Sequence, residues 1–374
     1  MICSYMRSSS YNNFEFCKMQ YYLNYVLGIP RSVGKKADKG TMVHKILECI
    51  ANIKLQEQNT NHINWLFEDE CLTSPLEIHK HDILKPQELT NKEIEDINKT
   101  RINKSNYPDN CQLKPGHTRY GVQLVEKIIQ NVYDYYTINT NHKWQPVDFR
   151  DITNWSWMAL DYQEGNFDPR RKRIIEPEIK FNIVIEKPWA KYDFTINQKR
   201  FQGNLAVRGT IDLLTRVDEG IIEIVDWKTG QRLNWETGQR KDYKSLSKDP
   251  QLLMYYWAVK QLFPEEEVIT SIFWIRDGGP YTFCFEKEHF DLAEKLMEKR
   301  FNEIKECQLP NRVDPTHNNF KCNRICDYYK IQSPDGKNNM CDFIHSSILE
   351  AGIDVVTEQY NRDTFNTYEN PGEI

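Results

Sequence analysis

A change in hydrophobic spacing at about residue 174 constrains the fold more than any other feature of the sequence. From that point apolar residues alternate with polar ones: Ile179, Phe181, Ile183 and Ile185. This period of two predicts a half-buried strand. Residues 207–217 and 221–228 predict two further strands, joined by the hairpin-like turn Asp218-Glu219-Gly220.

The next segments predict a helix placed between strands. Asp249 is suited to cap a helix that begins at Pro250. Residues 268–275 and 281–285 predict two more strands around a Gly-Gly turn, and an amphipathic helix is expected over residues 290–304. This order predicts an α/β fold with a central mixed β-sheet flanked by helices.

Helices are also expected before the sheet. A first helix should run from Ser8 to Gly28, with an apolar stripe formed by Tyr11, Phe14, Cys17, Tyr21 and Tyr25. A second is expected over residues 41–55. Residues 56–165 are polar and rich in Asn and Lys, and the helical stripe from Val122 to Tyr136 predicts a mostly helical insertion there.

The chain should therefore divide into four regions. Residues 1–55 form the N-terminal helices of the core domain, and residues 56–165 form the insertion. Residues 166–308 carry the sheet, and residues 309–374 form a loop-like, cysteine-rich segment with a polar tail. A length of 374 residues fits one large domain or two ordinary ones.

Composition limits the functional classes. No apolar run approaches the roughly 18 residues of a transmembrane helix, and the start lacks the layout of a signal peptide. We therefore expect a reducing, cytoplasmic location, in which the ten cysteines are unlike a disulfide framework. The formal net charge of −5 excludes a uniformly basic nucleic-acid coat but leaves room for a local basic track.

Acidic residues in two neighbouring predicted strands suggest a metal site. Asp226 and Lys228 are two residues apart, so they should point to the same side of their strand, and Asp212 on the preceding strand could face the same place. Two converging carboxylates both stay ionised only with a cation between them. Hard oxygen ligands of this kind suit Mg²⁺ or Mn²⁺.

Residues on two predicted helices complete this set. His44 and Glu48 share a helix face, and His44 could be a further ligand, which would favour Mn²⁺. Gln251 and Tyr255 share a face of the helix after Asp249. Each feature alone is more often an ordinary surface or boundary residue. Their joint order along the chain is hard to obtain by chance.

In this ordered set the chain resembles the RecB-like branch of the PD-(D/E)XK nuclease superfamily. The motifs that carry the resemblance are Gly40-Thr41-Met42-Val43-His44, Gly209-Thr210-Ile211-Asp212, Asp226-Trp227-Lys228-Thr229-Gly230 and Gln251-Leu252-Leu253-Met254-Tyr255. It implies that His44, Asp212, Asp226 and the backbone carbonyl of Trp227 bind one or two divalent ions. It also implies that Lys228 acts on the attacking water or the phosphate, and that Gln251 and Tyr255 steady the site or touch DNA. Glu178 on the preceding strand is a less secure member.

Four cysteines suggest a second cofactor. Cys17 lies on the first helix, and Cys322, Cys326 and Cys341 lie near the end of the chain. One distant cysteine plus a late group of three is awkward for structural zinc, which usually uses two close pairs, and suits a 4Fe–4S cluster. Many RecB-like nucleases have this arrangement, although the gaps between the late cysteines are longer here. The alternative is a core Cys17 with late cysteines that bind zinc or nothing.

The remaining cysteines have no companions at ligand spacing, and we interpret them as reduced thiols. They are Cys3, Cys49, Cys71, Cys111, Cys284 and Cys307. Basic residues gather near the proposed site and could contact a nucleic-acid strand, or could be solvated loops. They are Arg31, Lys35, Lys36, Lys39, Arg232, Arg240, Lys241, Lys244 and Lys248, with Trp235 and Tyr243 interleaved and a further block at Arg170-Arg171-Lys172-Arg173.

The resemblance implies a metal-dependent deoxyribonuclease. The favoured hypothesis is a RecB-like exonuclease that hydrolyses phosphodiester bonds at DNA ends or in single strands, in recombination, repair or phage DNA processing, within a bacterial or phage-infected cell. One alternative is a structure-specific endonuclease of the CRISPR-adaptation type. Another is a DNA-binding subunit that needs a partner. Residues 28–36 do not fit a P-loop, so a helicase motor would have to be a separate chain.

Overall fold

A computed structural model describes residues 1–30, 34–61, 119–196, 198–233, 238–314, 316 and 320–361. Arg31, Cys71, Cys111 and Trp235 from the sequence analysis lie outside these residues. None of the described helices is long and apolar enough to cross a membrane.

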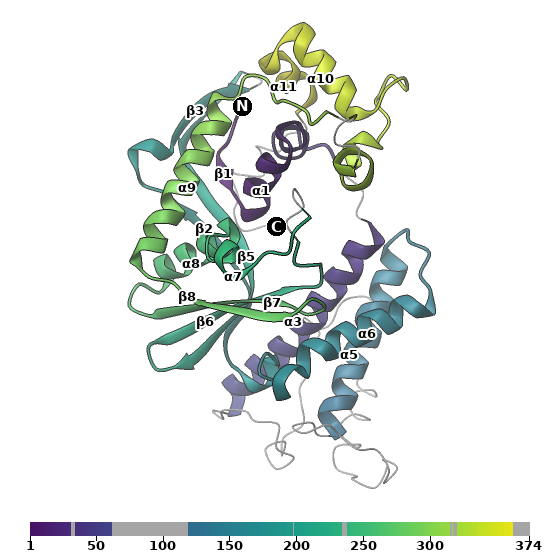
Figure 1. Cartoon of the computed structure of the whole chain (residues 1–374), viewed down its shortest axis with the longest axis vertical. Helices are drawn as coiled ribbons and strands as arrows, with labels where there is room; N and C mark the ends of the chain where they lie inside the picture. The colour runs from purple at the N-terminus through teal and green to yellow at the C-terminus, as the bar shows by residue number, and fades with distance from the viewer. Residues whose placement is uncertain are drawn as a thin grey trace.

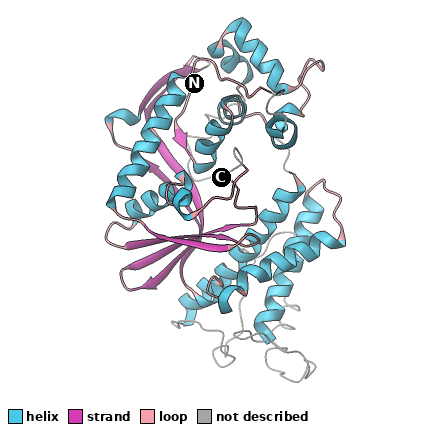
Figure 2. Ribbon diagram, in the orientation of Figure 1, coloured by secondary structure: helices cyan, strands magenta, loops and turns pink. Residues whose placement is uncertain are grey.

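A six-stranded mixed sheet forms the centre of the fold (Figures 1 and 2). Its strands are β1 (Tyr5–Met6), β2 (Arg173–Val184), β5 (Ala206–Asp218), β6 (Ile221–Lys228), β7 (Glu267–Trp274) and β8 (Gly279–Cys284). The order is β1-β5-β6-β7-β8, and β2 also pairs with β5. The β6–β7 and β1–β5 pairs are parallel and the others antiparallel. The predicted central mixed sheet is confirmed.

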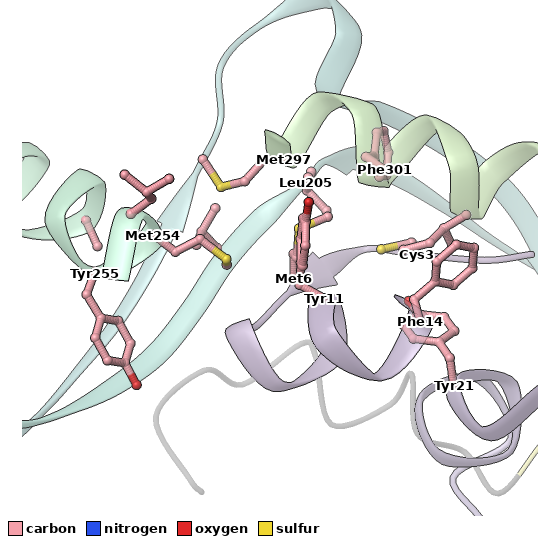
Figure 3. Packing of buried hydrophobic residues seen from close by; sticks show 14 of the residues in the cluster. Cys3, Met6, Tyr11, Phe14, Tyr21, Leu205, Met254, Tyr255, Met297 and Phe301 are labelled. Carbon is pink, nitrogen blue, oxygen red and sulfur yellow. The ribbon is translucent and has the colours of Figure 1, made fainter. Parts of the chain in front are cut away.

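One face of the sheet is covered by the N-terminal, C-terminal and central helices. These are α1 (Ser8–Phe16), α2 (Lys18–Tyr21), α8 (Pro250–Leu262), α9 (Lys287–Glu306), α10 (Met340–Ala351) and α11 (Ile353–Tyr360). Figure 3 shows Tyr11 and Phe14 of α1 beside Met297 and Phe301 of α9 in this core. Long-range packing therefore joins both ends of the chain to the sheet.

The other face is covered by α3 (Lys35–Asn61), α5 (Arg119–Asn139) and α6 (Pro146–Leu160). Their apolar side chains form a second core with Leu213, Val225 and Trp227 of the sheet. The helix predicted from the stripe Val122 to Tyr136 is α5. Residues 56–61 of the predicted insertion are the end of α3, α5 and α6 pack on that helix, and residues 62–118 lie outside the described residues.

The helix predicted after Asp249 is present as α8. The Asp249 carboxylate accepts a hydrogen bond from the Gln251 N–H at 3.0 Å, and Pro250 occupies the first turn. A side-chain cap of this kind stabilises a helix by about 1 kcal/mol. It also fixes the first turn of α8, from which Gln251 projects.

Two local predictions were wrong, and one hairpin was missed. The first helix is not continuous: Cys17 has extended backbone (φ −165°) between α1 and α2, and a π-helical turn follows over Tyr22–Val26. The predicted loop after residue 309 contains α10 and α11, and Asn339 caps α10 by accepting from the Asp342 N–H. The hairpin β3 (Lys191–Ile196) and β4 (Lys199–Asn204) was not predicted. The short helix α7 (Tyr243–Leu246) precedes α8.

Candidate functional site

The sheet opens at the place where Asp212 and Asp226 lie. Pairing between β5 and β6 ends at Leu213 and Val225, so the next residue on each strand no longer has a backbone partner across this pair. The Asp212 Oδ2 atom accepts a hydrogen bond from the Trp227 N–H at 2.7 Å. A carboxylate thus replaces the carbonyl that would continue the ladder, which holds Asp212 at the point where the strands separate.

Glu178 and His44 meet Asp212 from two other elements. Glu178 lies on β2 opposite Asp212, between the pairs Pro177–Leu213 and Ile179–Ile211. Its φ of 50° is in the left-handed region, a strained conformation for a non-glycine residue. One ligand atom from each of His44, Glu178 and Asp212 lies within 4.8 Å of the others. The His44 Nδ1 atom is 3.3 Å from the Asp212 Oδ2 atom.

Two motif glycines allow the elements to approach closely. A Cβ atom on Gly40 of α3 would lie 2.6 Å from the Thr229 Oγ1 atom, and one on Gly209 of β5 would lie 2.4 Å from the Phe181 ring. Both distances are too short for a side chain. Gly40 therefore allows the start of α3, and with it His44, to lie against the end of β6. Gly209 on β5 leaves room for the ring of Phe181 on β2.

The site faces a cavity of about 450 Å³. Besides His44, Glu178 and Asp212, its lining residues are Ala37, Gly40, Thr41, Lys45, Glu48, Tyr136 and Thr229. Lys45 forms an ion pair with Glu48 at 2.7 Å within this lining. The walls come from α3, α5 and the sheet, so the cavity forms only when all three layers assemble.

Asp226, Lys228, Gln251 and Tyr255 form an adjoining group. The Lys228 Nζ atom is 2.5 Å from the Asp226 Oδ2 atom. Gln251 donates to the other carboxylate oxygen of Asp226 at 3.2 Å and lies 3.0 Å from the Tyr255 hydroxyl. Asp226 is therefore held by a cation and an amide from two sides. Asp226 is not one of the three residues, His44, Glu178 and Asp212, whose ligand atoms converge.

Burial and charge shift the pKa values of these carboxyl groups in different directions. Burial, reinforced by Asp212 and Glu48, raises the pKa of Glu178 to about 7. Burial, opposed by Lys228 and reinforced by Asp212, raises the pKa of Asp226 to about 6. Burial also acts to raise the pKa of Asp212, but His44 and Lys228 outweigh it and the pKa is lowered.

The basic groups respond to the same carboxylates. Burial disfavours the charged forms of Lys228 and His44, but Asp226 and Asp212 respectively outweigh it and raise both pKa values. The site therefore gathers more negative charge than its own cations neutralise, as a site for a divalent cation should.

The four cysteines singled out in the sequence line one small cavity. Cys17, Cys322, Cys326 and Cys341 all face it, with Arg312, Tyr329 and Leu23 among its other lining residues. Burial raises the pKa of Cys326 to about 11, and Cys17 and Cys322 add to the rise. The break between α1 and α2 falls at Cys17, which lines this cavity together with the three C-terminal cysteines.

Within the described residues no three of these sulfur atoms lie within 4.8 Å of one another. Tetrahedral zinc with Zn–S bonds of about 2.3 Å would bring its thiolates to within about 4 Å of one another. As they stand, the described cysteines are therefore more widely spaced than the thiolates of a zinc site.

Basic residues after β6 mostly hold their own loop in place. Arg240 pairs with Asp277 at 2.6 Å, and Lys241 pairs with Asp249 at 2.6 Å. Arg232 donates to the Lys241 carbonyl at 2.6 Å. These contacts give the three residues a structural role near the site.

Comparisons with known proteins agree with this geometry at the level of the family. The family model of the PD-(D/E)XK nuclease superfamily matches residues 8–331, whereas no curated protein matches the chain. A crystal structure of SSO0001 matches with a TM-score of 0.24 and 17% identity, over 58% of this chain and 80% of that one, which is too little similarity to inform the site. The family match spans α3, strands β2 to β8 and α8, and the chain belongs to the PD-(D/E)XK nuclease superfamily.

Proposed function

We propose that the chain is a divalent-metal-dependent deoxyribonuclease, most closely a RecB-like exonuclease that acts on DNA ends or single strands. The observation that carries the proposal is the convergence of His44, Glu178 and Asp212 from three separate elements onto one point beside a cavity. Family membership supports metal-dependent nuclease chemistry, and the preference for ends or single strands extends the proposal beyond it.

The chemistry of the donor set fits Mg²⁺ or Mn²⁺. Glu178 and Asp212 supply hard oxygen ligands, and His44 supplies a nitrogen that favours Mn²⁺. Two carboxylates this close repel each other, and the raised pKa of Glu178 reflects that repulsion as well as burial. Asp226 and the Trp227 carbonyl remain proposed ligands.

A bound divalent ion would polarise the phosphodiester and make an attacking water more acidic. The residues of the chain supply the rest. The Lys228 ammonium is paired with Asp226 and stays protonated, so it can stabilise negative charge that develops on a phosphate. Gln251 fixes the Asp226 carboxylate through one oxygen, which leaves the other for Lys228. Tyr255 contacts Gln251 and so orients its amide.

DNA hydrolysis should depend on added metal and on free ends. With Mn²⁺ we expect the protein to degrade linear single-stranded DNA, and excess EDTA should stop the reaction because the carboxylates then lack their cation. The measurement is a gel assay that compares free-ended linear DNA with closed circular DNA. Cleavage of the circle at an equal rate would contradict the exonuclease proposal, and no metal-dependent cleavage of either would contradict the nuclease itself.

We also propose that Cys17, Cys322, Cys326 and Cys341 bind a 4Fe–4S cluster. Their shared cavity and wide spacing support this assignment. The long gap before Cys341 folds compactly: Gln332 and Asn339 form a β-bridge, and Asn339 then caps α10. Cys341 is thereby returned to the cavity despite the unusual spacing.

Protein purified without oxygen should be brown and contain about four irons per chain. Cys326→Ser should lose most of the iron, since it removes one thiolate from the shared cavity. The matched control is Cys284→Ser, because Cys284 is exposed and lies outside the group. Iron analysis and visible absorption provide the measurement. A colourless, iron-free wild type would rule the cluster out, and zinc in its place would support the alternative.

A further inference from the structure

The β2–β5 ribbon has one face that carries the candidate metal group. Odd-numbered residues of this part of the ribbon, including Ile179, Phe181 and Val207, pack into the core beneath α1 and α8. Side chains alternate along a strand, so the even-numbered residues point to the opposite face. Glu178 and Asp212 belong to this even-numbered face, which continues beyond them toward β1.

Polar and basic residues continue this face from the metal group outward. The next cross-strand pair is Lys180 with Thr210, and the one after it is Asn182 with Arg208. Lys180 and Asn182 are exposed, and Arg208 is half-buried. The Arg208 Nε atom donates to the Asn182 side-chain oxygen at 2.8 Å. The guanidinium group is therefore held in place on the face.

Tyr5 of β1 extends the same row. Tyr5 pairs with Ala206 on β5, next to Arg208 along the face. The Arg208 guanidinium lies 5.2 Å from the centre of the Tyr5 ring, and the exposed Arg7 guanidinium lies 5.6 Å from it. Such cation–π contacts restrain long basic side chains. Lys180 and then Arg208 thus lie at increasing distance along the ribbon from the metal group, and Arg7, directly after β1, lies level with Arg208.

The distances along this row suit a chain of phosphates that begins at the metal group. A strand rises about 3.4 Å per residue, so Lys180 lies about 7 Å and Asn182 about 14 Å along β2 from Glu178. A chain of phosphates with one phosphate at the metal group would place the following phosphates beside these residues. A single row of cations suits the backbone of one strand better than the two backbones of a duplex.

We propose that one strand of a DNA substrate runs along the even-numbered face of the β2–β5 ribbon, with its phosphates on Lys180, Arg208 and Arg7. This inference rests on the proposed function, since it assigns a path for the substrate of the same site. It adds that the ribbon, rather than the basic loop after β6, supplies the main electrostatic contacts away from the metal. A DNA strand is the proposed occupant because its phosphates complement the cations of the row, and because the row is continuous with Glu178 and Asp212.

The test is binding of a fluorescent 20-nucleotide oligothymidine, measured by anisotropy with Ca²⁺ in place of Mn²⁺. The variant Lys180→Ala/Arg208→Ala should bind about tenfold more weakly at low salt. Its slope of log affinity against log salt should fall by about 1.4, because each phosphate contact on a single strand contributes about 0.7. The matched control, Arg200→Ala/Lys299→Ala, removes two cations away from this face, whose side chains are 65% and 74% exposed, and should bind like wild type.

A second variant guards against loss of folding. Thr210→Glu adds a negative charge opposite Lys180 without removing a contact, and it should also weaken binding. Equal affinity and equal salt slope in wild type and in both variants would overturn the ribbon path, as would a wild type that does not bind the oligonucleotide. Binding that depends on the ribbon in a protein that cleaves nothing with Mn²⁺ would instead overturn the nuclease proposal and leave the path standing.

Discussion

Asp212→Asn should reduce Mn²⁺-dependent DNA hydrolysis by at least about a thousandfold, since loss of the ion removes several kcal/mol of transition-state stabilisation. Asp212 links α3 to β6 within the site: its Oδ2 atom lies 3.3 Å from the His44 Nδ1 atom and accepts a hydrogen bond from the Trp227 N–H at 2.7 Å. Asparagine keeps an oxygen for the N–H but removes the charge. The measurement is the single-turnover rate of cleavage of linear DNA at saturating protein.

A thermal-shift assay separates this loss from misfolding. Wild type should gain about 4 °C in its melting temperature from Mn²⁺ at a hundredfold excess over the dissociation constant, which corresponds to about 2.7 kcal/mol. Asp212→Asn should fold without metal and lose this gain. The control Asp193→Asn changes an aspartate on β3 far from the site in sequence and should behave like wild type. Activity within tenfold of wild type in Asp212→Asn would remove Asp212 from the metal site.

The fold was predictable because its elements carry local signals. The alternation of Ile179, Phe181 and Ile183 marks β2, and the run that ends at Lys228 marks β6 with the same bounds as the structure. Asp249 and Pro250 mark the start of α8. Each of these signals depends on residues that are neighbours in sequence, so the chain alone was enough to infer a central mixed sheet.

Glu178 shows where local signals are insufficient. Its backbone has a φ of 50°, and nothing in the residues around it requires that conformation. The strain is tolerated because β2 pairs with β5 on both sides of Glu178. Only the resemblance to the nuclease family pointed to Glu178, as a less secure member of the site. It identified a candidate without showing that Glu178, rather than Asp226, meets His44.

The break at Cys17 has the same kind of cause. Neither glycine nor proline interrupts residues 8–27, and the stripe from Tyr11 to Tyr25 predicts a continuous helix. The helix ends at Phe16, and Cys17 lines a cavity shared with Cys322, Cys326 and Cys341, more than 300 residues away in sequence. Contacts of that separation leave no periodic trace in a single sequence.

Lys228→Met should destabilise the protein in the absence of metal by about 3 kcal/mol, the lower end of the effect for a broken buried ion pair. The Asp226 side chain is 2% exposed, and the Lys228 ammonium lies 2.5 Å from it, so the variant leaves a buried carboxylate with Gln251 as its described partner. Lys228 itself is 29% exposed, and Asp226 can take up a proton, which keeps the loss at the lower end. The shift in the midpoint of urea unfolding measures it.

The double variant Asp226→Asn/Lys228→Met separates stability from catalysis. It removes both charges and keeps an oxygen that can accept from Gln251, so its unfolding free energy should return to within about 1 kcal/mol of wild type. Both Lys228→Met and the double variant should hydrolyse DNA poorly, because each lacks the ammonium beside the phosphate and the double variant also lacks the charge of a proposed metal ligand. If the destabilisation of the single variants simply adds in the double variant, Asp226 and Lys228 are not a coupled pair. If hydrolysis recovers with stability, Lys228 acts only on the fold.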